Sequence, residues 1–191
     1  MIAPALFNST TDLWATPPEL FAELARRFGP FDLDVCATAD NAKCPRFFTP
    51  DQDGLQQPWH GRCWMNPPYG KRIAKWIRKA WESSLQGATV VCLLPARTDT
   101  RWWQDYVLPF ATKIEYIRGR LRFGGMRSSA PFPSAIVVFA PAKLFRCHWC
   151  ERPFKPRRKD KKFCSGACRQ AAYRAWPVTA ISVTPALLSG E

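Results

Sequence analysis

Long runs of apolar residues are missing from this chain of 191 residues. No stretch approaches the roughly 20 apolar residues that a membrane-spanning helix needs. Residues 1–8 also lack the charged segment followed by an apolar segment that marks a secretion signal. We therefore expect a soluble cytoplasmic protein with no membrane partner. An apolar fraction of 47% and nine tryptophans can supply a core, which argues against disorder of the whole chain.

Acidic residues are also scarce, with 15 Asp and Glu against 28 Lys and Arg, which gives a net charge of +13. The excess is uneven along the chain. Residues 143–176 hold 11 lysines and arginines against only Glu151 and Asp160, a net charge of +9. A basic segment attached to a milder domain indicates a polyanionic partner and favours nucleic acid.

The eight cysteines fall into two groups. Cys63 and Cys92 lie in apolar runs, where cysteine acts as a small apolar side chain. Four others have the paired spacing of a four-thiolate zinc site: Cys147, Cys150, Cys164 and Cys168. Their segment is too short for a core of its own, so a structural zinc ion would stabilise its fold. Disulfides are the alternative, and a reducing cytoplasm disfavours them.

A basic loop flanked by aromatic residues separates the two cysteine pairs. Its candidate DNA-binding residues are Lys155, Arg157, Arg158, Lys159, Lys161 and Lys162. Such a loop would bind phosphates with salt-dependent affinity, independent of sequence; the alternative is a solvated loop on a protein-binding finger. The segment resembles a treble-clef or zinc-ribbon finger with a short helix over Arg169–Trp176. We expect residues 177–191 to form a disordered tail.

The first helix is expected after Thr16-Pro-Pro-Glu19, where Thr16 and Glu19 have the spacing of a capping box. This helix would end at Gly29-Pro30. Residues 31–35 alternate apolar and acidic side chains and predict a strand. Residues 36–60 show no period, which indicates either a functional loop or an element missed by pattern.

Further elements follow from the same patterns. Residues 73–85 have helical spacing, and the continuous apolar run 88–94 is typical of a central strand covered on both faces. A short helix over 100–108 and strands over 113–117, 121–123 and 134–140 complete the pattern, the last two strands being joined through Gly124-Gly125. The order predicts an α/β fold with a mostly parallel sheet and an antiparallel hairpin at one edge.

The stretch Arg62–Gly70 organises this pattern. Residues 63–65 read as a short buried strand, and Asn66-Pro-Pro-Tyr69 cannot continue it because proline carries no N–H. We expect the Asn66 side chain and the Tyr69 ring to be displayed past the carboxyl end of that strand, where ligands bind in open α/β sheets. The alternative is an ordinary proline-rich turn.

Taken together, these features resemble the class I S-adenosylmethionine-dependent methyltransferases and, more closely, the short phage-type Dam family of DNA adenine-N6 methyltransferases. The resemblance spans about residues 12–140 and rests on Trp14-Ala-Thr-Pro-Pro-Glu19, Phe31-Asp-Leu-Asp-Val-Cys-Ala37, Asp53-Gly-Leu55, Trp59, Asn66-Pro-Pro-Tyr69, Leu93-Leu-Pro95 and Arg118-Gly-Arg-Leu-Arg-Phe123. It implies a reduced Rossmann-like methyltransferase domain over residues 1–142, followed by the finger over residues 143–176.

The resemblance also implies a binding site for S-adenosylmethionine. Its expected contacts are Trp14, Thr16, Pro17, Asp34, Ala37, Asp53 and Asn66. Asp34 would hold the methionine amino group, and Asp53 would reach the adenine of the cofactor. Asp34 could instead be a turn residue at a strand end, and Asp53-Gly54 a plain turn. One departure is the lack of a glycine-rich loop after the first strand, since residues 36–40 contain no glycine.

The chemistry implied for the motif assigns catalytic roles to Asn66, Pro67, Pro68 and Tyr69. An adenine N6 lone pair is delocalised into the ring, so the nitrogen is a poor nucleophile. The Asn66 side-chain oxygen and the Pro67 carbonyl would accept its two N–H bonds and aim the lone pair at the methyl donor. The base must leave the duplex to be reached, and Tyr69 would stack on it.

The leading hypothesis is therefore a site-specific methyltransferase that acts on adenine N6 in double-stranded DNA, with S-adenosylmethionine and a structural zinc ion; we favour a monomer. One alternative keeps the enzyme but changes the acceptor, because the same motif serves methylation of RNA bases and of protein glutamine. Another is a DNA-binding zinc protein that no longer turns over. The basic finger argues against a protein substrate.

Overall fold

The structure is a computed structural model that describes residues 14–124, 126–141, 145–154, 156, 158 and 160–175. Contacts divide the chain into two compact units, residues 1–142 and residues 143–191. Within the described part of the chain, no helix is long and apolar enough to cross a membrane. The tail expected over residues 177–191 lies outside the described residues.

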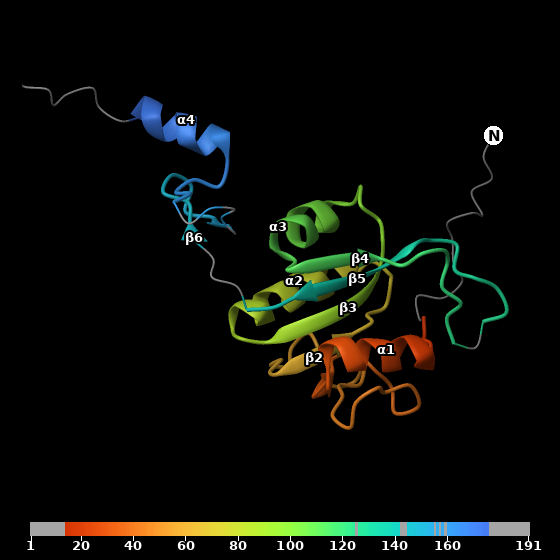
Figure 1. The fold of residues 1–191 in the computed structure, drawn as a ribbon. Helices are drawn as coiled ribbons and strands as arrows, with labels where there is room; N and C mark the ends of the chain where they lie inside the picture. The colour runs from red at the N-terminus through yellow and green to blue at the C-terminus, as the bar shows by residue number, and fades with distance from the viewer. Residues whose placement is uncertain are drawn as a thin grey trace, which may run out of the picture. The chain divides into compact units, whose positions relative to one another are not determined.

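A five-stranded mixed sheet forms the centre of the first unit (Figure 1). Its strands in spatial order are β1 (Leu33–Asp34), β2 (Arg62–Met65), β3 (Thr89–Pro95), β5 (Ser134–Phe139) and β4 (Lys113–Tyr116). The first three strands pair in parallel, and β5 pairs antiparallel to both β3 and β4. β4 therefore runs in the same direction as β1, β2 and β3. The predicted α/β class is confirmed.

The expected hairpin at the sheet edge was wrong. Residues 121–123 form no strand, and β5 lies between β3 and β4 instead of at the edge. All six residues of β5 are buried, which suits a strand with neighbours on both sides. Phe123, which was expected on the strand 121–123, is 1% exposed because its side chain packs against the Trp14 ring.

Helices flank the sheet at α1 (Pro18–Phe28) and α2 (Ile73–Leu85), the latter with the predicted bounds. The helix expected over residues 100–108 is present, since residues 101–110 are helical without a break. Its middle is the π-helical segment η2 (Trp103–Val107), and it continues into the short α3 (Leu108–Phe110). Pro109 does not end the helix as expected, because the helix extends one residue further, to Phe110.

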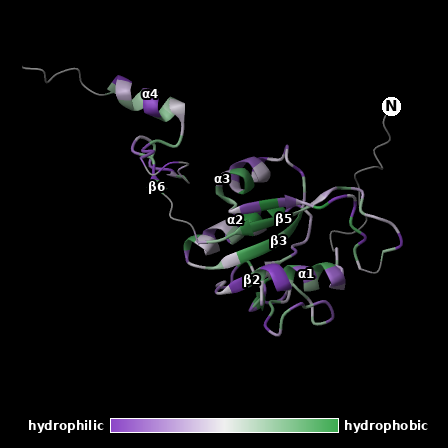
Figure 2. Cartoon of the chain, in the orientation of Figure 1, coloured by the Kyte–Doolittle hydropathy of each residue, from purple (hydrophilic) through white to green (hydrophobic). Residues whose placement is uncertain are grey.

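The core is built on β3 and β5, which are apolar along most of their length (Figure 2). Cys63 and Cys92 are fully buried in it and act as small apolar side chains, as predicted. Trp76 is buried and stacks near Trp59, with ring centroids 6.0 Å apart. Because β3 and β5 are buried along nearly all of their length, both faces of the sheet are covered there. A ligand can therefore reach the sheet only at the ends of its strands.

The second unit contains a two-stranded antiparallel ribbon of β6 (Phe145–Arg146) and β7 (Pro153–Phe154), followed by α4 (Gly166–Ala175). The helix begins three residues earlier than the Arg169 predicted from sequence, so Cys168 lies in its first turn. Trp176, its expected last residue, lies outside the described residues.

Candidate active site

Two predicted site residues, Asp34 and Asn66, lie at the carboxyl edge of the sheet. Asp34 ends β1, Asn66 directly follows β2, and the register pairs Asp34 with Trp64, two residues before Asn66. Because β1 and β2 are parallel, their carboxyl ends lie at the same edge. The irregular stretch 36–60 follows β1 at this edge.

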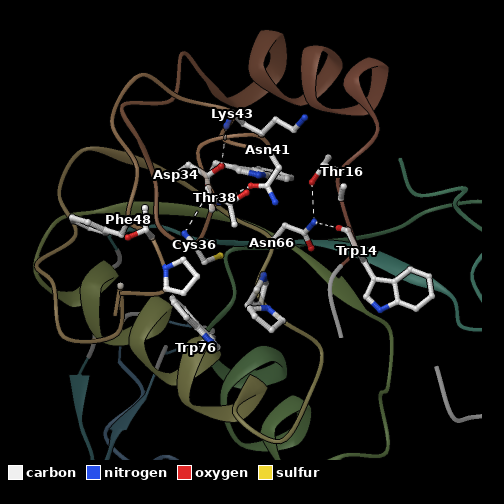
Figure 3. Close-up of a pocket in the computed structure, with 18 of the residues that line it drawn as sticks. Trp14, Thr16, Asp34, Cys36, Thr38, Asn41, Lys43, Phe48, Asn66 and Trp76 are labelled. Carbon is white, nitrogen blue, oxygen red and sulfur yellow. Dashed lines mark hydrogen bonds between the residues drawn. The ribbon is translucent and has the colours of Figure 1, made fainter. Parts of the chain in front are cut away.

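A cavity of about 300 Å³ opens at this edge (Figure 3). Eight of the predicted residues line it: Trp14, Thr16, Asp34, Ala37, Asp53, Asn66, Pro67 and Pro68. Pro17 and Tyr69, which were also predicted, are not among its lining residues. The volume suits a small organic ligand.

The Asn66 amide is held from its nitrogen side. Asn66 Nδ2 donates to the Trp14 carbonyl oxygen at 2.5 Å and to Thr16 Oγ1 at 2.9 Å (Figure 3). A main-chain carbonyl only accepts, so the amide nitrogen, and not the oxygen, must face Trp14. Asn66 Oδ1 is buried and has no hydrogen-bond partner among the described residues. The site therefore holds a fixed acceptor that lacks a donor.

Thr16 does not cap the first helix. The N-cap of α1 is Pro17, and no side chain there makes a capping bond, so the expected capping box was wrong. The Thr16 hydroxyl instead accepts the bond from Asn66. Thr16 is 4% exposed, and a contact with a residue 50 positions away competes with the local cap.

Asp34 presents a buried carboxylate to the cavity. Its oxygens accept backbone N–H bonds from Cys36 at 3.3 Å and Lys43 at 3.1 Å. Burial raises the pKa of Asp34 to about 6, against the opposing effect of these two donors. A buried carboxylate facing a cavity favours a cationic group as its partner.

The Tyr69 ring is not displayed as the sequence had suggested. It is 6% exposed, and its hydroxyl donates to the Leu93 carbonyl oxygen at 3.1 Å. The ring makes edge contacts with Phe123 and Phe132, at centroid distances of 6.2 and 5.6 Å. The stiff turn buries this side chain because an aromatic cluster from another part of the chain receives it.

Asp53 serves both as a turn residue and as part of the cavity wall. It has a positive φ of 41° and pairs with Arg72, with Nη2 to Oδ2 at 3.2 Å. A Cβ on the next residue, Gly54, would lie 2.1 Å from the Val35 carbonyl oxygen. Only glycine therefore lets the Asp53-Gly54 turn pack against the end of β1.

Sequence reasoning missed several residues of the cavity wall. They are Thr38, Asn41, Lys43, Phe48, Arg72 and Trp76. Four of them lie in the stretch 36–60, whose lack of period gave no local signal beyond its position after Asp34. Trp76 was expected only in the core, and it serves both the core and the cavity.

The four clustered cysteines of the second unit come together as their spacing suggests. Their Sγ atoms all lie within 4.8 Å of one another, and all four are free thiols. Cys164 Sγ lies 3.6 Å from Cys150 Sγ and 3.5 Å from Cys168 Sγ. Zinc–sulfur bonds of about 2.3 Å in a tetrahedron imply sulfur separations of about 3.8 Å, so this arrangement fits a zinc ion.

The thiol of Cys147 is also prepared for metal binding. Burial raises its pKa, but backbone N–H donors, among them those of Cys150 and Cys164, outweigh burial and lower the pKa to about 6. The thiolate is the form that binds metal. The cluster is compatible with zinc on both geometry and donor chemistry.

The mixed sheet, with a cavity at the carboxyl ends of β1 and β2 and the Asn-Pro-Pro-Tyr turn beside it, agrees with the S-adenosylmethionine-dependent methyltransferase fold expected from the sequence. Within this class, the chain belongs to the family described as DNA N-6-adenine-methyltransferase (Dam), whose profile matches residues 5–143.

Two similar proteins come from bacteriophages. A DNA N-6-adenine-methyltransferase of Haemophilus phage HP1 is 38% identical over 142 residues, which are 70% of this chain and 82% of that protein. One of Escherichia phage T1 is 34% identical over 100 residues, or 51% of this chain and 42% of that protein. A solved SAM-dependent O-methyltransferase from Thermotoga maritima aligns at a TM-score of 0.43 with 12% identity, covering 69% of this chain and 68% of that chain.

Family membership confirms the activity in the leading hypothesis, methyl transfer to adenine N6 in DNA, while the double-stranded substrate, the zinc ion and the monomer stay predictions. The protein is a DNA adenine-N6 methyltransferase, and its substrate is DNA. This result favours adenine in DNA as the methyl acceptor over RNA bases and protein glutamine. It also favours an active enzyme over a DNA-binding protein that does not turn over.

Proposed function

We propose that the cavity binds S-adenosylmethionine and that Asn66 and Pro67 orient the N6 amino group of a flipped adenine toward it. The observation that carries this proposal is the buried Asn66 Oδ1, fixed in direction by two bonds to Nδ2 and left without a donor. Leaving such an acceptor unpaired costs about 1–3 kcal/mol. An amino N–H of the target base would supply the missing donor.

The amino group of adenine has two N–H bonds, and this chain offers two acceptors for them. Asn66 Oδ1 would take one and the Pro67 carbonyl oxygen the other, which draws the nitrogen away from planarity and frees its lone pair. Pro67 and Pro68 hold these acceptors because their φ angles are fixed. The cofactor supplies a methyl carbon already activated by the positive sulfonium, so the chain needs no strong base.

The wall of the cavity suits the charges of the cofactor. Asp34 would hold the cationic amino group, since its carboxylate is buried and lacks a cationic side chain within bonding distance among the described residues. Trp14, Thr16 and Ala37 line the same cavity. Asp53 is already paired with Arg72, so these two residues would contact the cofactor as a pair.

The test of this proposal is the variant Asn66→Ala in the full chain. We expect methyl transfer to fall about 100-fold or more, the size of effect seen when one aligned polar group is removed from a reaction centre. Cofactor affinity should change little. Nucleoside mass spectrometry of DNA from expressing cells measures N6-methyladenine, and titration calorimetry measures cofactor binding.

The matched control is Gln86→Ala, which removes an exposed amide at the end of α2 and should leave methylation unchanged. Full methylation by Asn66→Ala would refute the role of Asn66. Loss of both cofactor binding and folding in that variant would assign Asn66 a structural role instead.

We also propose that the four cysteines bind one structural zinc ion and that this finger binds double-stranded DNA. Arg158 and Lys162 are exposed in the basic loop, and Lys161 is half-buried near the Phe154 ring. Among the described residues, the Arg158 side chain makes only an exposed contact with Asp160, at 3.6 Å, and such a contact adds little stability in water. Three other residues predicted for this surface lie outside the described residues: Lys155, Arg157 and Lys159.

A further inference from the structure

Five exposed arginines lie on two loops of the first unit, and a sixth is the first residue of the helix after one of these loops; none of the six was among the residues predicted to bind DNA. We call them the arginine patch: Arg97 and Arg101 after β3, and Arg118, Arg120, Arg122 and Arg127 between β4 and β5. In residues 96–101 and 117–133, which contain these arginines, Asp99 is the only acidic residue.

Both loops are at the same sheet edge as Asn66. β3 and β4 run in the direction of β2, so the segments that leave them start at the edge where β2 ends, and antiparallel β5 begins there. The backbone links the segments to one another, since Ala96 N donates to Pro133 O at 2.8 Å. It also links the second loop to the cavity wall, since Gly124 N donates to Ala15 O at 2.9 Å.

These arginines lack anionic partners within the described part of the chain. None of the six forms an ion pair with a carboxylate there, and Arg120 donates only to the Pro131 carbonyl oxygen, at 3.4 Å. Elsewhere in the unit some arginines, Arg27, Arg72 and Arg78, are paired with acidic side chains, whereas others, such as Arg26, form no ion pair among the described residues. Unpaired charges of one sign repel one another, and a polyanion relieves that repulsion.

An aromatic cluster fastens the second loop to the catalytic turn. The loop residues Phe123 and Phe132 are buried, and their rings lie 5.2 and 4.9 Å from the Trp14 ring. Both also contact Tyr69, three residues after Asn66. The loop therefore carries its charges outward while its apolar residues fix its distance from Asn66.

We propose that the arginine patch binds the phosphate backbone of duplex DNA on either side of the flipped adenine. The inference rests on the proposed function, because it takes Asn66 as the point where the target base enters. A guanidinium group can bind two phosphate oxygens at once through two parallel N–H bonds. The two loops place such groups at the sheet edge where Asn66 lies. The first unit would then bind DNA without the finger, and the finger would add a second DNA contact.

The experiment compares two full-length double variants with equal loss of charge. Arg118→Ser with Arg122→Ser removes two members of the patch. Arg26→Ser with Arg78→Ser removes two exposed arginines from α1 and α2, outside the loops that carry the patch. Fluorescence anisotropy measures affinity for a duplex of about 20 base pairs over a range of salt concentrations.

We expect the patch variant to bind about tenfold more weakly at low salt, with the slope of log affinity against log salt reduced by about 2. Cofactor affinity should be unchanged, as should kcat at saturating DNA. The control variant should stay within about twofold of the wild type. Unchanged affinity and slope in the patch variant would overturn the proposal, and so would tighter binding of an RNA duplex of equal length.

This outcome can be separated from the test of the proposed function. Asn66→Ala should keep the wild-type slope of log affinity against log salt, because its change leaves the arginine patch intact. If Asn66→Ala still methylates, the assignment of Asn66 fails whatever the patch variant does. If only the patch variant behaves as wild type, the DNA surface is wrong and the assignment of Asn66 stands.

Discussion

The side-chain amide of Asn66 has two ends in opposite surroundings. Its nitrogen is fully used by Trp14 and Thr16, while its oxygen is buried and lacks a donor among the described residues. The indole nitrogen of Trp14 is likewise buried without a partner there. A folded protein leaves few buried polar atoms unpaired, and those it leaves point to a bound ligand or to function.

If Asp34 holds the cofactor as proposed, we expect cofactor binding to depend on pH. Its pKa of about 6 lies above the ordinary 3.8, so the free protein increasingly protonates it below pH 6. A protonated carboxyl cannot pair with the cationic amino group. We expect the affinity for S-adenosylmethionine to fall about tenfold between pH 7 and pH 5, as measured by calorimetry.

The variant Asp34→Asn is the control for this prediction. It should bind the cofactor weakly at every pH and show little pH dependence between 5 and 7. An equally steep pH dependence in the variant would place the titrating group elsewhere. The same raised pKa means that Asp34 destabilises the free protein as pH rises from about 4 to 6, because the folded state then binds more protons than the unfolded state.

At the scale of elements, the loop between β4 and β5 depends on the aromatic cluster around Tyr69. Tyr69→Phe keeps the ring and removes only the bond to the Leu93 carbonyl oxygen. We expect the free energy of unfolding to fall by about 1 kcal/mol in urea titrations, with methyl transfer within a few-fold of the wild type. The reason is that the Tyr69 ring is buried and its hydroxyl bonds to the main chain, so the hydroxyl has a structural role.

Tyr116→Phe is the matched control, since Tyr116 is 60% exposed and its change should leave stability unaltered. A loss of methyl transfer of 100-fold or more in Tyr69→Phe, without loss of stability, would show that the hydroxyl acts in the reaction.

The elements themselves were predictable where the signal is local. α2 has the bounds that its apolar spacing gave, and β3 was recognised from a continuous apolar run. The stretch 36–60 was not predictable, because backbone bonds to β1, such as Phe48 N to Asp34 O at 3.0 Å, hold it in place of a repeating pattern. Four of the six missed cavity residues lie in this stretch, and a fifth, Trp76, is a helix position already assigned to the core.

At the scale of the whole molecule, we expect the two units to be stabilised by different interactions. The first unit has a large apolar core, whereas Cys147 and Phe154 are the only buried residues among those described in the second. A structural metal would then carry most of the stability of the finger.

We expect one zinc per chain in the purified wild type and none in Cys164→Ser, as measured by elemental mass spectrometry. Cys36→Ser should keep its zinc, because Cys36 lies in the other unit. The zinc-free variant should still bind S-adenosylmethionine but should bind DNA more weakly, most visibly at low salt. A zinc-free wild type with disulfides among the four cysteines would contradict the zinc assignment.

The sequence alone determined the family, the order of the motifs and the grouping of the four cysteines. These features are local, because two prolines stiffen a turn and short spacings bring thiols together wherever the chain folds. Only the tertiary structure decided which way Asn66 faces, that Tyr69 is buried, and that arginines from two separate loops share an edge with the site. Each of these depends on partners tens of residues away, which no local pattern specifies.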